Sequence, residues 1–306
     1  MKKILKKILP KTVIKYGIVL KIKLRLLIIR EKILKSYSNQ NKPIDIEQII
    51  EYIKKYKKID MISYEFAKKY ENLQVQIYKD EDLGLYYVIH KGNRMYFKKS
   101  MSLEQIESYY RIICLEQDFK SPHRYLDEEN DFSVVEGDVV LDIGSAEGNF
   151  ILDNIEKISE AYLFEFESEW IDALKATFKP FENKVHIIQK YVSDCNQGNE
   201  ITIDSFLEER NKKIDFLKMD IEGSEMKALR GAVKTLNQNE KIKLAICTYH
   251  NEDDECKFKQ WLSKFNFRID FSEGYIIPIW DLYKINVFGR RVTLPLRKGV
   301  LRAKKL

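Results

Sequence analysis

The sequence predicts an α/β fold, with a mostly parallel sheet, helices on both faces and a small N-terminal α+β extension. From residue 134 onward, short apolar strands alternate with amphipathic helices, which is the pattern of a parallel sheet with right-handed crossovers. Before residue 131, helical stripes are followed by short β-rich runs between turn residues. The 306 residues exceed one compact core, so we expect a main domain with appendages.

Four regions follow from changes in composition. They are a basic amphipathic segment (1–36), a helical and β-meander region with a polar lid or linker (37–130), the α/β domain (131–288) and a basic tail (289–306). In the second region we expect helices over 44–57 and 62–70, strands over 75–78, 85–89 and 95–97, and a helix that begins at the Ser102/Gln105 capping box. In the α/β domain we expect strands over 139–141, 161–164, 185–188, 214–219 and 244–249, helices over 150–158, 170–178, 225–236 and 257–265, and a terminal hairpin over 267–271 and 275–280.

Charge is distributed unevenly along the chain. The net charge is +6, but residues 1–36 contain twelve Lys or Arg and one acidic residue, and residues 289–306 contain seven Lys or Arg and no acidic residue. The body between them is therefore acidic. A nucleic-acid-binding protein normally carries a basic stripe on its folded domain, so we expect no nucleic-acid partner. Four cysteines without a C-x-x-C pair indicate neither a zinc site nor a disulfide framework, which fits a reducing cytosol.

The N-terminal segment mixes Ile and Leu with Lys and Arg. It has no apolar run of the ~20 residues that a spanning helix needs. Ile18, Ile22, Leu26, Ile29 and Ile33 share one helical face. Such a segment is typical of a helix that lies on an anionic membrane surface, and we expect a cytoplasmic protein in peripheral contact with the inner membrane face. The alternative is that these apolar residues pack against the protein's own small domain.

A nucleotide-binding turn is predicted where the first strand of the α/β domain meets its helix. Asp142-Ile-Gly144-Ser145-Ala-Glu-Gly148 contains glycines that allow a tight turn. Glu165 follows at the end of the second strand, where an acid can accept both ribose hydroxyls. An ordinary strand–turn–helix would explain the glycines alone, but the acid at this spacing favours a cofactor that contains a nucleoside.

Electrostatics favour S-adenosylmethionine (SAM) over NAD. A dinucleotide fingerprint, G-x-G-x-x-G, places a pyrophosphate on the helix N-terminus. Here Ala146 and Glu147 occupy the middle of the motif, and a carboxylate beside a pyrophosphate is unfavourable. SAM carries no phosphate and has a cationic sulfonium and ammonium, which Asp142 and Glu147 can tolerate.

A second motif, Lys218-Met-Asp220-Ile-Glu222-Gly-Ser-Glu225, lies at the carboxyl end of the fourth strand, where open α/β sheets bind ligands. Three acids so close together must be solvated, paired, bound to a cation or raised in pKa. Glu225 has the ordinary role of an acid at a helix start. Asp220, at the strand tip, is the better candidate for a functional residue.

Two histidines accompany this motif. His250 follows Tyr249 at the end of the fifth strand, so we expect it near Asp220, as a base or a ligand or simply as a satisfied polar residue. His123 lies in the polar stretch Ser121-Pro-His-Arg-Tyr125, where a loop turn anchored by proline is the better interpretation.

These motifs together resemble the FkbM family of SAM-dependent methyltransferases. The resemblance rests on Asp142–Phe150, Phe164-Glu165, Thr202–Leu207 and Lys218–Glu225 with Leu229 and Gly231, and covers about residues 110–265. It implies a class I, Rossmann-like methyltransferase fold that O-methylates hydroxyls of sugars or other metabolites. It also implies that Asp142, Gly144, Ser145 and Gly148 line the SAM turn, that Glu165 holds the ribose and that Asp194 contacts adenine.

The expected chemistry is in-line transfer of a methyl group to a hydroxyl, mostly by alignment. Asp220, His250 and Glu222 are the candidate catalytic residues, and a base would assist the hydroxyl. A divalent cation held by Asp220 and neighbouring acids is a second route, with the metal unknown.

The expected acceptor is a glycan or other sugar-containing molecule. Five basic residues of the tail are expected either to meet an anionic part of it or to be solvated, namely Arg297, Lys298, Arg302, Lys304 and Lys305. An NAD-dependent oxidoreductase and a non-catalytic, membrane-associated binding module remain alternatives.

Overall fold

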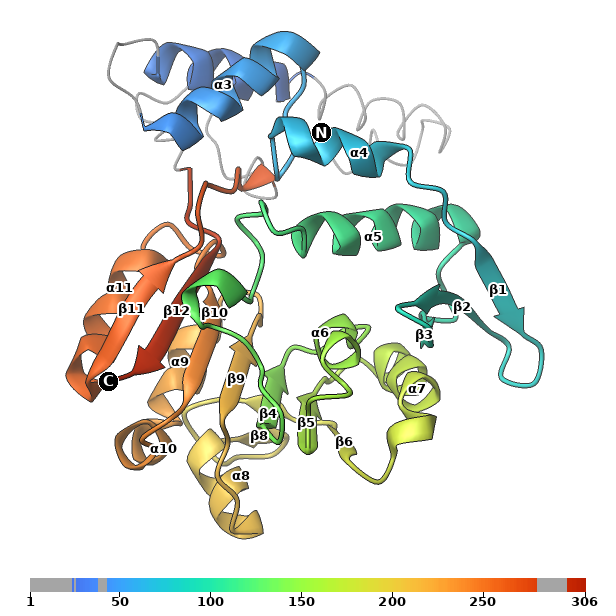
Figure 1. Cartoon of the computed structure of the whole chain (residues 1–306), viewed down its shortest axis with the longest axis vertical. Helices are drawn as coiled ribbons and strands as arrows, with labels where there is room; N and C mark the ends of the chain where they lie inside the picture. The colour runs from blue at the N-terminus through green and yellow to red at the C-terminus, as the bar shows by residue number, and fades with distance from the viewer. Residues whose placement is uncertain (1–23, 25, 38–42, 280–295) are drawn as a thin grey trace, which may run out of the picture. The chain divides into compact units, whose positions relative to one another are not determined.

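A computed structural model describes residues 24, 26–37, 43–279 and 296–306 of the chain. The chain divides into two compact units (Figure 1). The first unit comprises Met1–Ala67 and Tyr275–Arg297, and the second comprises Lys68–Gly274 and Lys298–Leu306. These units do not follow the expected boundaries. The β-meander belongs to the same unit as the large sheet, and residues 275–279 belong to the other one.

The first unit is helical in its described part. Residues 26–36 form a helix, followed by α3 (Ile44–Tyr56) and the 3₁₀ turn η1 (Glu65–Ala67). The predicted apolar face is confirmed at Ile29 and Ile33, which are buried and so favour packing over membrane contact for this stretch. Ile18 and Ile22 lie outside the described residues. No helix in the described ranges combines the length and the apolar character that a membrane crossing requires.

The expected terminal hairpin over 267–271 and 275–280 is wrong. The Ile277 N–H donates to the Met61 carbonyl at 2.9 Å, and the Tyr275 N–H donates to the Tyr64 hydroxyl at 2.8 Å. Ile276 forms an isolated antiparallel bridge with Arg297. Segment 275–279 is therefore tied to the first unit, and Trp280 lies outside the described residues.

The second unit contains the large sheet. In chain order its elements are α4 (Lys68–Glu71), β1 (Ile77–Asp80), β2 (Leu85–His90), β3 (Asn93–Tyr96), α5 (Leu103–Glu116), η2 (Glu128–Asn130), β4 (Val139–Ile143), α6 (Asn149–Asp153), β5 (Glu160–Phe164), α7 (Ser168–Thr177), η3 (Lys179–Phe181), β6 (Val185–Ile188), β7 (Tyr191–Val192), β8 (Glu200–Ile201), α8 (Ile203–Arg210), β9 (Phe216–Met219), α9 (Glu225–Arg230), α10 (Val233–Gln238), β10 (Lys243–Cys247), α11 (Asp254–Leu262), η4 (Ser263–Phe265), β11 (Phe267–Phe271) and β12 (Val300–Lys305). The capping box predicted at Ser102 and Gln105 is confirmed at the start of α5.

The seven-stranded sheet has the order β11-β12-β10-β9-β4-β5-β6. Its first five strands in chain order, β4, β5, β6, β9 and β10, are parallel and follow the Rossmann order 3-2-1-4-5. β12 runs antiparallel between β10 and β11. Strands β1, β2 and β3 form a separate antiparallel meander, as predicted.

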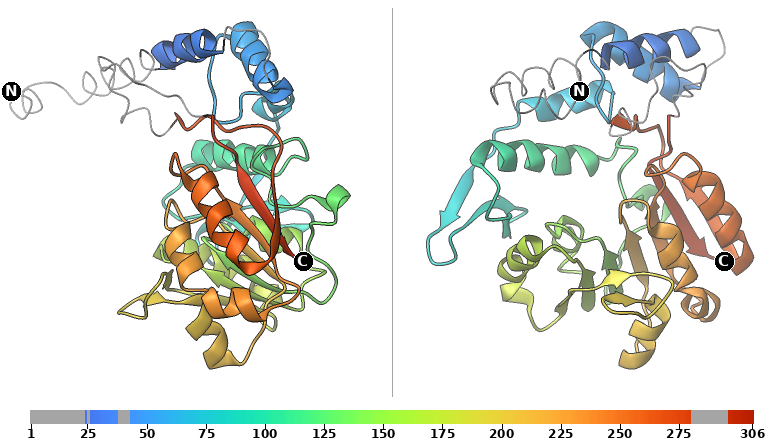
Figure 2. Two further views of the ribbon diagram at one scale, coloured as in Figure 1. Left: turned by 90° about the vertical axis from the view of Figure 1, so that its left-hand side faces the viewer. Right: turned by 180° about the vertical axis from the view of Figure 1, so that it is seen from behind.

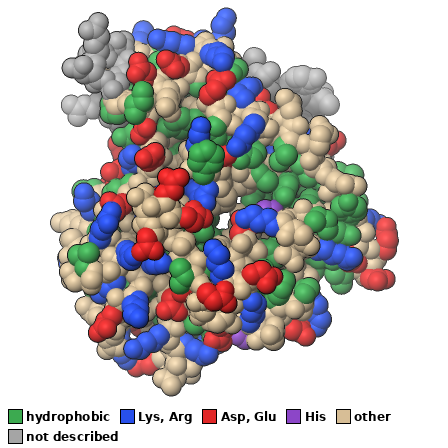
Figure 3. All heavy atoms as spheres, in the orientation of Figure 1, with side chains coloured by type: hydrophobic (Ala, Val, Ile, Leu, Met, Phe, Trp, Pro, Cys, Tyr) green, Lys and Arg blue, Asp and Glu red, His purple; other side chains and the backbone are tan. Residues whose placement is uncertain are grey.

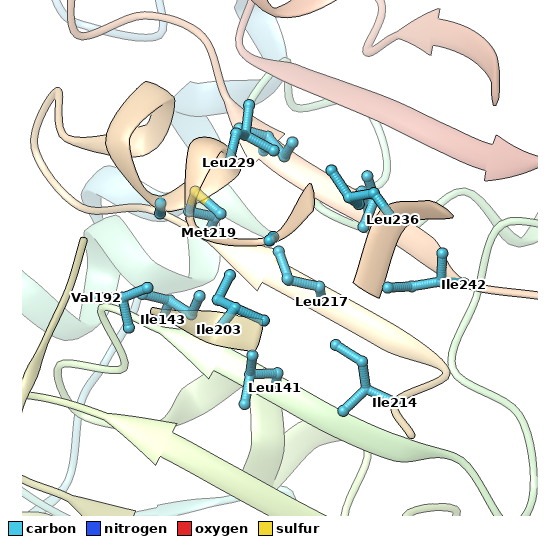
Figure 4. Close-up of a cluster of buried hydrophobic side chains, with 14 of the residues drawn as sticks. Leu141, Ile143, Val192, Ile203, Ile214, Leu217, Met219, Leu229, Leu236 and Ile242 are labelled. Atoms are coloured by element: carbon cyan, nitrogen blue, oxygen red, sulfur yellow. The ribbon is translucent and has the colours of Figure 1, made fainter. Parts of the chain in front are cut away.

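Helices cover both faces of the sheet, as predicted (Figure 2). Alternate side chains of the central strands point to opposite faces. Leu141 and Leu217 join a buried cluster with Ile203 of α8 and Leu236 of α10 (Figure 4). Phe216 points to the other face, where its ring lies 5.5 Å from the ring of Phe150 in α6.

The basic C-terminal tail is the clearest error of the sequence analysis. Residues 300–305 form a strand inside the sheet, and the side chains of Val300, Leu301 and Ala303 in it are completely buried. Arg302 is also buried, and its guanidinium donates to the carbonyls of Arg124, Tyr125 and Leu126 and to the Asp127 carboxylate. Lys304 pairs with Asp131, and Lys305 donates to the carbonyls of Leu236 and Phe265. Arg302 and Lys305 therefore make contacts within the fold and Lys304 forms an exposed ion pair, so Val300–Lys305 is not a solvated tail.

The same contacts show that residues 121–131, expected to be a polar lid or linker, are fixed against the sheet. Ser121, His123 and Tyr125 are buried. The Pro122 carbonyl accepts a hydrogen bond from Ser272, and a side chain at Gly299 would come within 1.8 Å of that carbonyl. The segment is clamped between β12 and the chain that follows β11.

We expect Arg302→Met to lower the free energy of unfolding by roughly 3 kcal/mol, because it leaves three carbonyls and one carboxylate without their shared donor. Arg268→Met on neighbouring β11 is the control. That side chain is exposed and, among the described residues, forms its ion pair with Asp270, so its loss should stay below about 1 kcal/mol. Urea unfolding measures both. Equal losses would contradict a clamping role for Arg302.

Candidate active site

The two sequence motifs meet at the point where the strand order reverses. β4 and β9 are neighbours, and the chain leaves them in opposite directions, which is where open α/β sheets bind ligands. Gly144, just after β4, has a φ of +79°, and a Cβ there would come within 2.0 Å of the Asp220 carbonyl oxygen. Glycine is therefore required both by the backbone conformation and by the close approach of the second motif.

Asp142 and Lys218 form a buried ion pair across these two strands. They are register partners, with Lys218 Nζ 2.9 Å from Asp142 Oδ1 and 2.5 Å from the Gly144 carbonyl. Burial disfavours the charged amine, but Asp142 and Asp220 raise the pKa of Lys218. Asp142 has no exposed surface. It therefore supports the cofactor turn through Lys218 rather than by direct contact with a ligand.

Glu165 lies against the glycine turn, as the sequence predicted. One of its carboxylate oxygens accepts the Ala146 N–H at 3.1 Å, and the other accepts the N–H groups of Phe166 and Glu167. Ser145 donates its hydroxyl to the Asp142 carbonyl at 2.9 Å and so closes the turn internally. The turn and the acid thus form one hydrogen-bonded unit at the carboxyl ends of β4 and β5.

Gly148 serves packing rather than ligand approach. It begins α6 with a φ of +80°, and a Cβ there would meet the Phe178 ring at 2.6 Å and Leu174 at 2.8 Å. This contact brings α6 close to the end of α7. Its expected place in the cofactor turn is therefore indirect.

Glu147 explains why this turn departs from a glycine-rich pattern. Its buried carboxylate accepts a hydrogen bond from the Tyr109 hydroxyl of α5 at 2.7 Å. The Tyr109 ring also lies 5.6 Å from the ring of Trp170 in α7. α5 is thereby fastened above the ends of the strands (Figure 1), and a hollow opens between them in the space-filling view (Figure 3). Sequence reasoning missed Tyr109 because its partner is 38 residues away.

Asp220 is the centre of a polar cluster. Its carboxylate accepts hydrogen bonds from the hydroxyls of Tyr125 at 3.0 Å and Tyr249 at 3.1 Å. His250 Nε2 lies 3.3 Å from Asp220 Oδ1, and His123 Nε2 lies 3.6 Å from Oδ2. Burial acts against ionisation, but the charges of His250 and His123 lower the pKa of Asp220 to about 2. Asp220 is therefore a fixed anion at neutral pH.

His250 is brought to Asp220, as predicted, but as a cation. Its Nδ1 lies 2.9 Å from Glu225 Oε1, which also accepts the Ile221 N–H at 2.9 Å. Burial lowers the pKa of His250, but Glu225 and Asp220 more than offset this effect and raise it to about 9. A protonated His250 cannot serve as a base. Glu222 lies 3.7 Å from His250 Nε2, with its side chain 93% exposed, so it stands at the rim of the cluster.

His123 is part of the site and not a simple loop turn. Its Nε2 lies 2.8 Å from the Tyr249 hydroxyl, and burial lowers its pKa to about 4. No sequence signal points to Tyr125 or His123, because both depend on the clamp by Arg302, which is 177 residues beyond Tyr125.

Asp194 lies after β7 and is partly exposed, 3.8 Å from Arg230. Near the same edge the rings of Phe166 and Tyr191 stack with their centroids 3.8 Å apart. Phe166 directly follows Glu165, so an aromatic surface lies beside the predicted ribose acid. The sequence analysis missed this pair.

Two sets of side chains in the described part of the chain have the spacing of metal ligands. They are Asp220, Glu225 and His250, and His123, Asp220 and Cys247, each with ligand atoms within 4.8 Å of one another. Carboxylates with an imidazole suit a divalent cation. A cation on the first set would have to replace the proton of His250.

Comparisons with known proteins find similarity over part of the chain. Residues 144–276 match the family model described as "Methyltransferase FkbM domain". A crystal structure of methyltransferase FkbM from Methylobacillus flagellatus is 16% identical, with a TM-score of 0.47, over 64% of this chain and 52% of that one. The chain thus spans about half the length of that protein. No curated protein matches the sequence significantly.

Two further solved structures show weaker similarity. An rRNA methylase from Streptococcus thermophilus is 13% identical, with a TM-score of 0.39, over 56% of this chain and 90% of that one. Precorrin-6y C5,15-methyltransferase from Geobacter metallireducens is 10% identical, with a TM-score of 0.39, over 68% of this chain and 94% of that one.

The strand order, the antiparallel β12 and the turn with its acid define a class I methyltransferase fold. The resemblance to the FkbM family is confirmed over residues 144–276, which match the FkbM methyltransferase domain model.

The chain has only four histidines, so their titration can be followed individually by NMR. We expect His250 to titrate near pH 9 and His123 near pH 4. Because the pKa of His250 is raised above its ordinary 6.5, its contribution to stability is complete below about pH 6.5 and is lost as the pH rises through about 9. His250→Gln should remove the alkaline transition. A His250 that titrates near 6.5 would contradict the paired geometry.

Proposed function

We propose that this protein is a SAM-dependent O-methyltransferase that acts on a hydroxyl of a sugar or glycan. The observation that carries the proposal is the position of Glu165 against the glycine turn, beside the anionic Asp220 cluster. Such a reaction needs three parts. They are an acid that can hold the ribose, a turn that suits a cofactor without a phosphate, and an anion at the next strand tip that can accept a hydrogen bond.

The residues divide into two groups. Glu165 would hold the ribose, with Phe166 and Asp194 toward the adenine, while Asp142, Lys218 and Ser145 keep the turn in shape. When bound, SAM supplies a methyl group on a cationic sulfur for in-line displacement, a reaction in which the leaving group needs no acid.

Asp220 would accept a hydrogen bond from the acceptor hydroxyl, orient it and take up its proton as the hydroxyl oxygen is methylated. Tyr125 and Tyr249 fix its carboxylate, and protonated His250 balances part of its charge. Alignment of this kind contributes several kcal/mol, roughly up to ten. Asp220, Glu225 and His250 could instead hold a divalent cation that acidifies the hydroxyl.

The alternatives are an NAD-dependent oxidoreductase and a non-catalytic binding module, and different observations argue against each. A pyrophosphate would face the buried carboxylate of Glu147, which disfavours NAD. A non-catalytic module would have no need for an ionised Asp220 held by three donors in a buried site, so we favour the enzyme.

For the acceptor, we keep a sugar-containing molecule and expect no nucleic acid, because the body of the chain is acidic. Contact of the basic segment 1–25 with an anionic membrane, where lipid-linked glycans are accessible, remains part of the proposal, whereas Ile29 and Ile33 are buried in the protein.

The direct test is transfer of label from methyl-labelled SAM to a panel of neutral oligosaccharides, nucleotide sugars and a short RNA. Label in a sugar, stable to mild base, supports the proposal. Label in the RNA alone would replace it by a nucleic-acid methyltransferase, and labelling of none of them, together with a lack of SAM binding, would refute it.

Glu165→Ala should weaken SAM binding by about 10- to 100-fold, since it removes charge-assisted hydrogen bonds worth ~1.5–3 kcal/mol. Glu167→Ala is the matched control, because that exposed residue pairs with Lys98 instead. Isothermal titration measures both affinities. Unchanged affinity in a folded Glu165→Ala protein would sink the cofactor assignment.

Asp220→Asn should lower the turnover number by at least ~10²-fold while SAM still binds. The reason is that the neutral amide lacks the negative charge that the carboxylate presents to the hydroxyl. Asp253→Asn, an exposed pair with Lys257, should leave turnover unchanged. Retained turnover would make Asp220 structural. Dialysis against a chelator tests the cation: full activity afterwards excludes it, and a loss restored by Mg²⁺ establishes it.

A further inference from the structure

A second pocket lies outside the Asp220 cluster, between α5, α6 and the antiparallel meander (Figure 1). Side chains from residues 70–78, 88–91, 110–117 and 149–153 line it, and we call it the meander pocket. All of these residues belong to the second unit. The volume of the pocket is about 550 Å³, which is within the range of roughly 300–1,000 Å³ that is usual for sites of small molecules.

His90, the last residue of β2, connects three walls of the meander pocket. Its Nε2 lies 2.6 Å from Oδ1 of Asp153 in α6, and its Nδ1 lies 3.0 Å from the hydroxyl of Tyr110 in α5. Lys91 Nζ lies 3.0 Å from the same oxygen of Asp153. Because these bonds fix the walls in advance, a ligand does not have to order them.

The lining of the meander pocket carries little free charge. Lys91 and Asp153 are the lysine and the acid among the lining residues, and they pair with each other. Tyrosine rings, side-chain amides and aliphatic side chains make up most of the remaining surface. A phosphate or carboxylate on a ligand would meet a lysine that is already paired. The composition therefore suits a ligand that is polar and uncharged.

Asn149 provides a buried polar group toward this pocket. It is the first residue of α6 and is 9% exposed. Its side-chain amide has no hydrogen-bond partner in the part of the chain that the structure describes. A buried amide without a partner is costly, so we expect a ligand to supply one. An amide both donates and accepts hydrogen bonds, as a sugar hydroxyl does.

The meander pocket borders both parts of the candidate active site. At one end, Asn149 directly follows Gly148 of the cofactor turn. At the other end, Gln117 Oε1 accepts the Tyr125 N–H at 3.4 Å, and the Tyr125 hydroxyl donates to Asp220 at 3.0 Å. A molecule whose hydroxyl is at Asp220 can therefore extend toward this pocket.

We propose that the meander pocket is a second subsite, which binds an uncharged sugar unit of the acceptor beyond the unit that is methylated. The identity of the ligand rests on the proposed function. Tyrosine rings such as that of Tyr78 would cover the apolar face of the sugar, and the amides of Asn149 and Gln76 would bond to its hydroxyls. An acceptor with two or more sugar units is then preferred to a monosaccharide.

The first test measures binding without cofactor or turnover. Saturation-transfer NMR is recorded on the full chain with neutral disaccharides of glucose, galactose, mannose and N-acetylglucosamine, and with a disaccharide that contains a uronic acid. At least one neutral disaccharide should bind, more tightly than the acidic one, and Gln76→Ala should weaken it at least fivefold. Gln260→Ala, an exposed glutamine of α11, is the matched control. Binding of no neutral disaccharide, or equal affinity in both variants, would overturn the proposal.

The second test separates a ligand-binding role of Asn149 from a structural one. Asn149→Ala should raise the acceptor's KM at least fivefold, with SAM affinity and the urea midpoint unchanged, because no bond within the protein is lost. Asn154→Ala should instead lower the midpoint and leave KM unchanged, since the Asn154 side chain donates to the Phe150 carbonyl at 2.8 Å. Equal losses of stability, or equal KM values for a monosaccharide and a disaccharide acceptor, would refute the subsite.

Failure of the subsite and failure of the proposed function can be told apart. Methyl transfer that Gln76→Ala and Asn149→Ala both leave unchanged would refute the subsite and keep the proposed function. Disaccharide binding that depends on Gln76, in a protein that does not bind SAM, would refute the proposed function and support the sugar site alone.

Discussion

The buried pair of Asp142 and Lys218 is the interaction on which the site depends. A lysine in the middle of a parallel sheet is costly unless it is paired, and Lys218 meets that need through Asp142 in register and through the Gly144 carbonyl. Asp142 is the first residue of the motif 142–148, and Lys218 is the first residue of the motif 218–225. The pair therefore fixes the cofactor turn against the acidic strand tip, and Gly144 leaves no room between them.

Around this fixed edge the environment separates the acids by role. Asp220 is surrounded by donors, so its pKa is low and it stays anionic. Glu147 faces burial and the charge of Asp142, which raise its pKa. Carboxylates whose pKa values differ in this way can take different roles in one site.

Much of the α/β domain could be predicted because its signals are local. Alternating apolar runs, the capping box at Ser102 and the acid after β5 each lie within a few residues of the structure that they specify. The charged C-terminus was misjudged for the opposite reason. Arg302 contacts residues 124–127, and composition alone cannot distinguish a buried clamp from a solvated tail. Tyr125 and His123 were missed with it, since that clamp holds their segment in place.

The central proposal is that the space above β4 and β9 receives SAM, with its ribose on Glu165 and its charged sulfur toward Asp220. A crystal structure of the protein with S-adenosylhomocysteine tests this most directly. The account predicts ribose hydroxyls within hydrogen-bond distance of Glu165 and the sulfur in the space under Tyr109, Tyr125 and Tyr249. A nucleoside bound elsewhere, or with its ribose away from Glu165, would contradict the account.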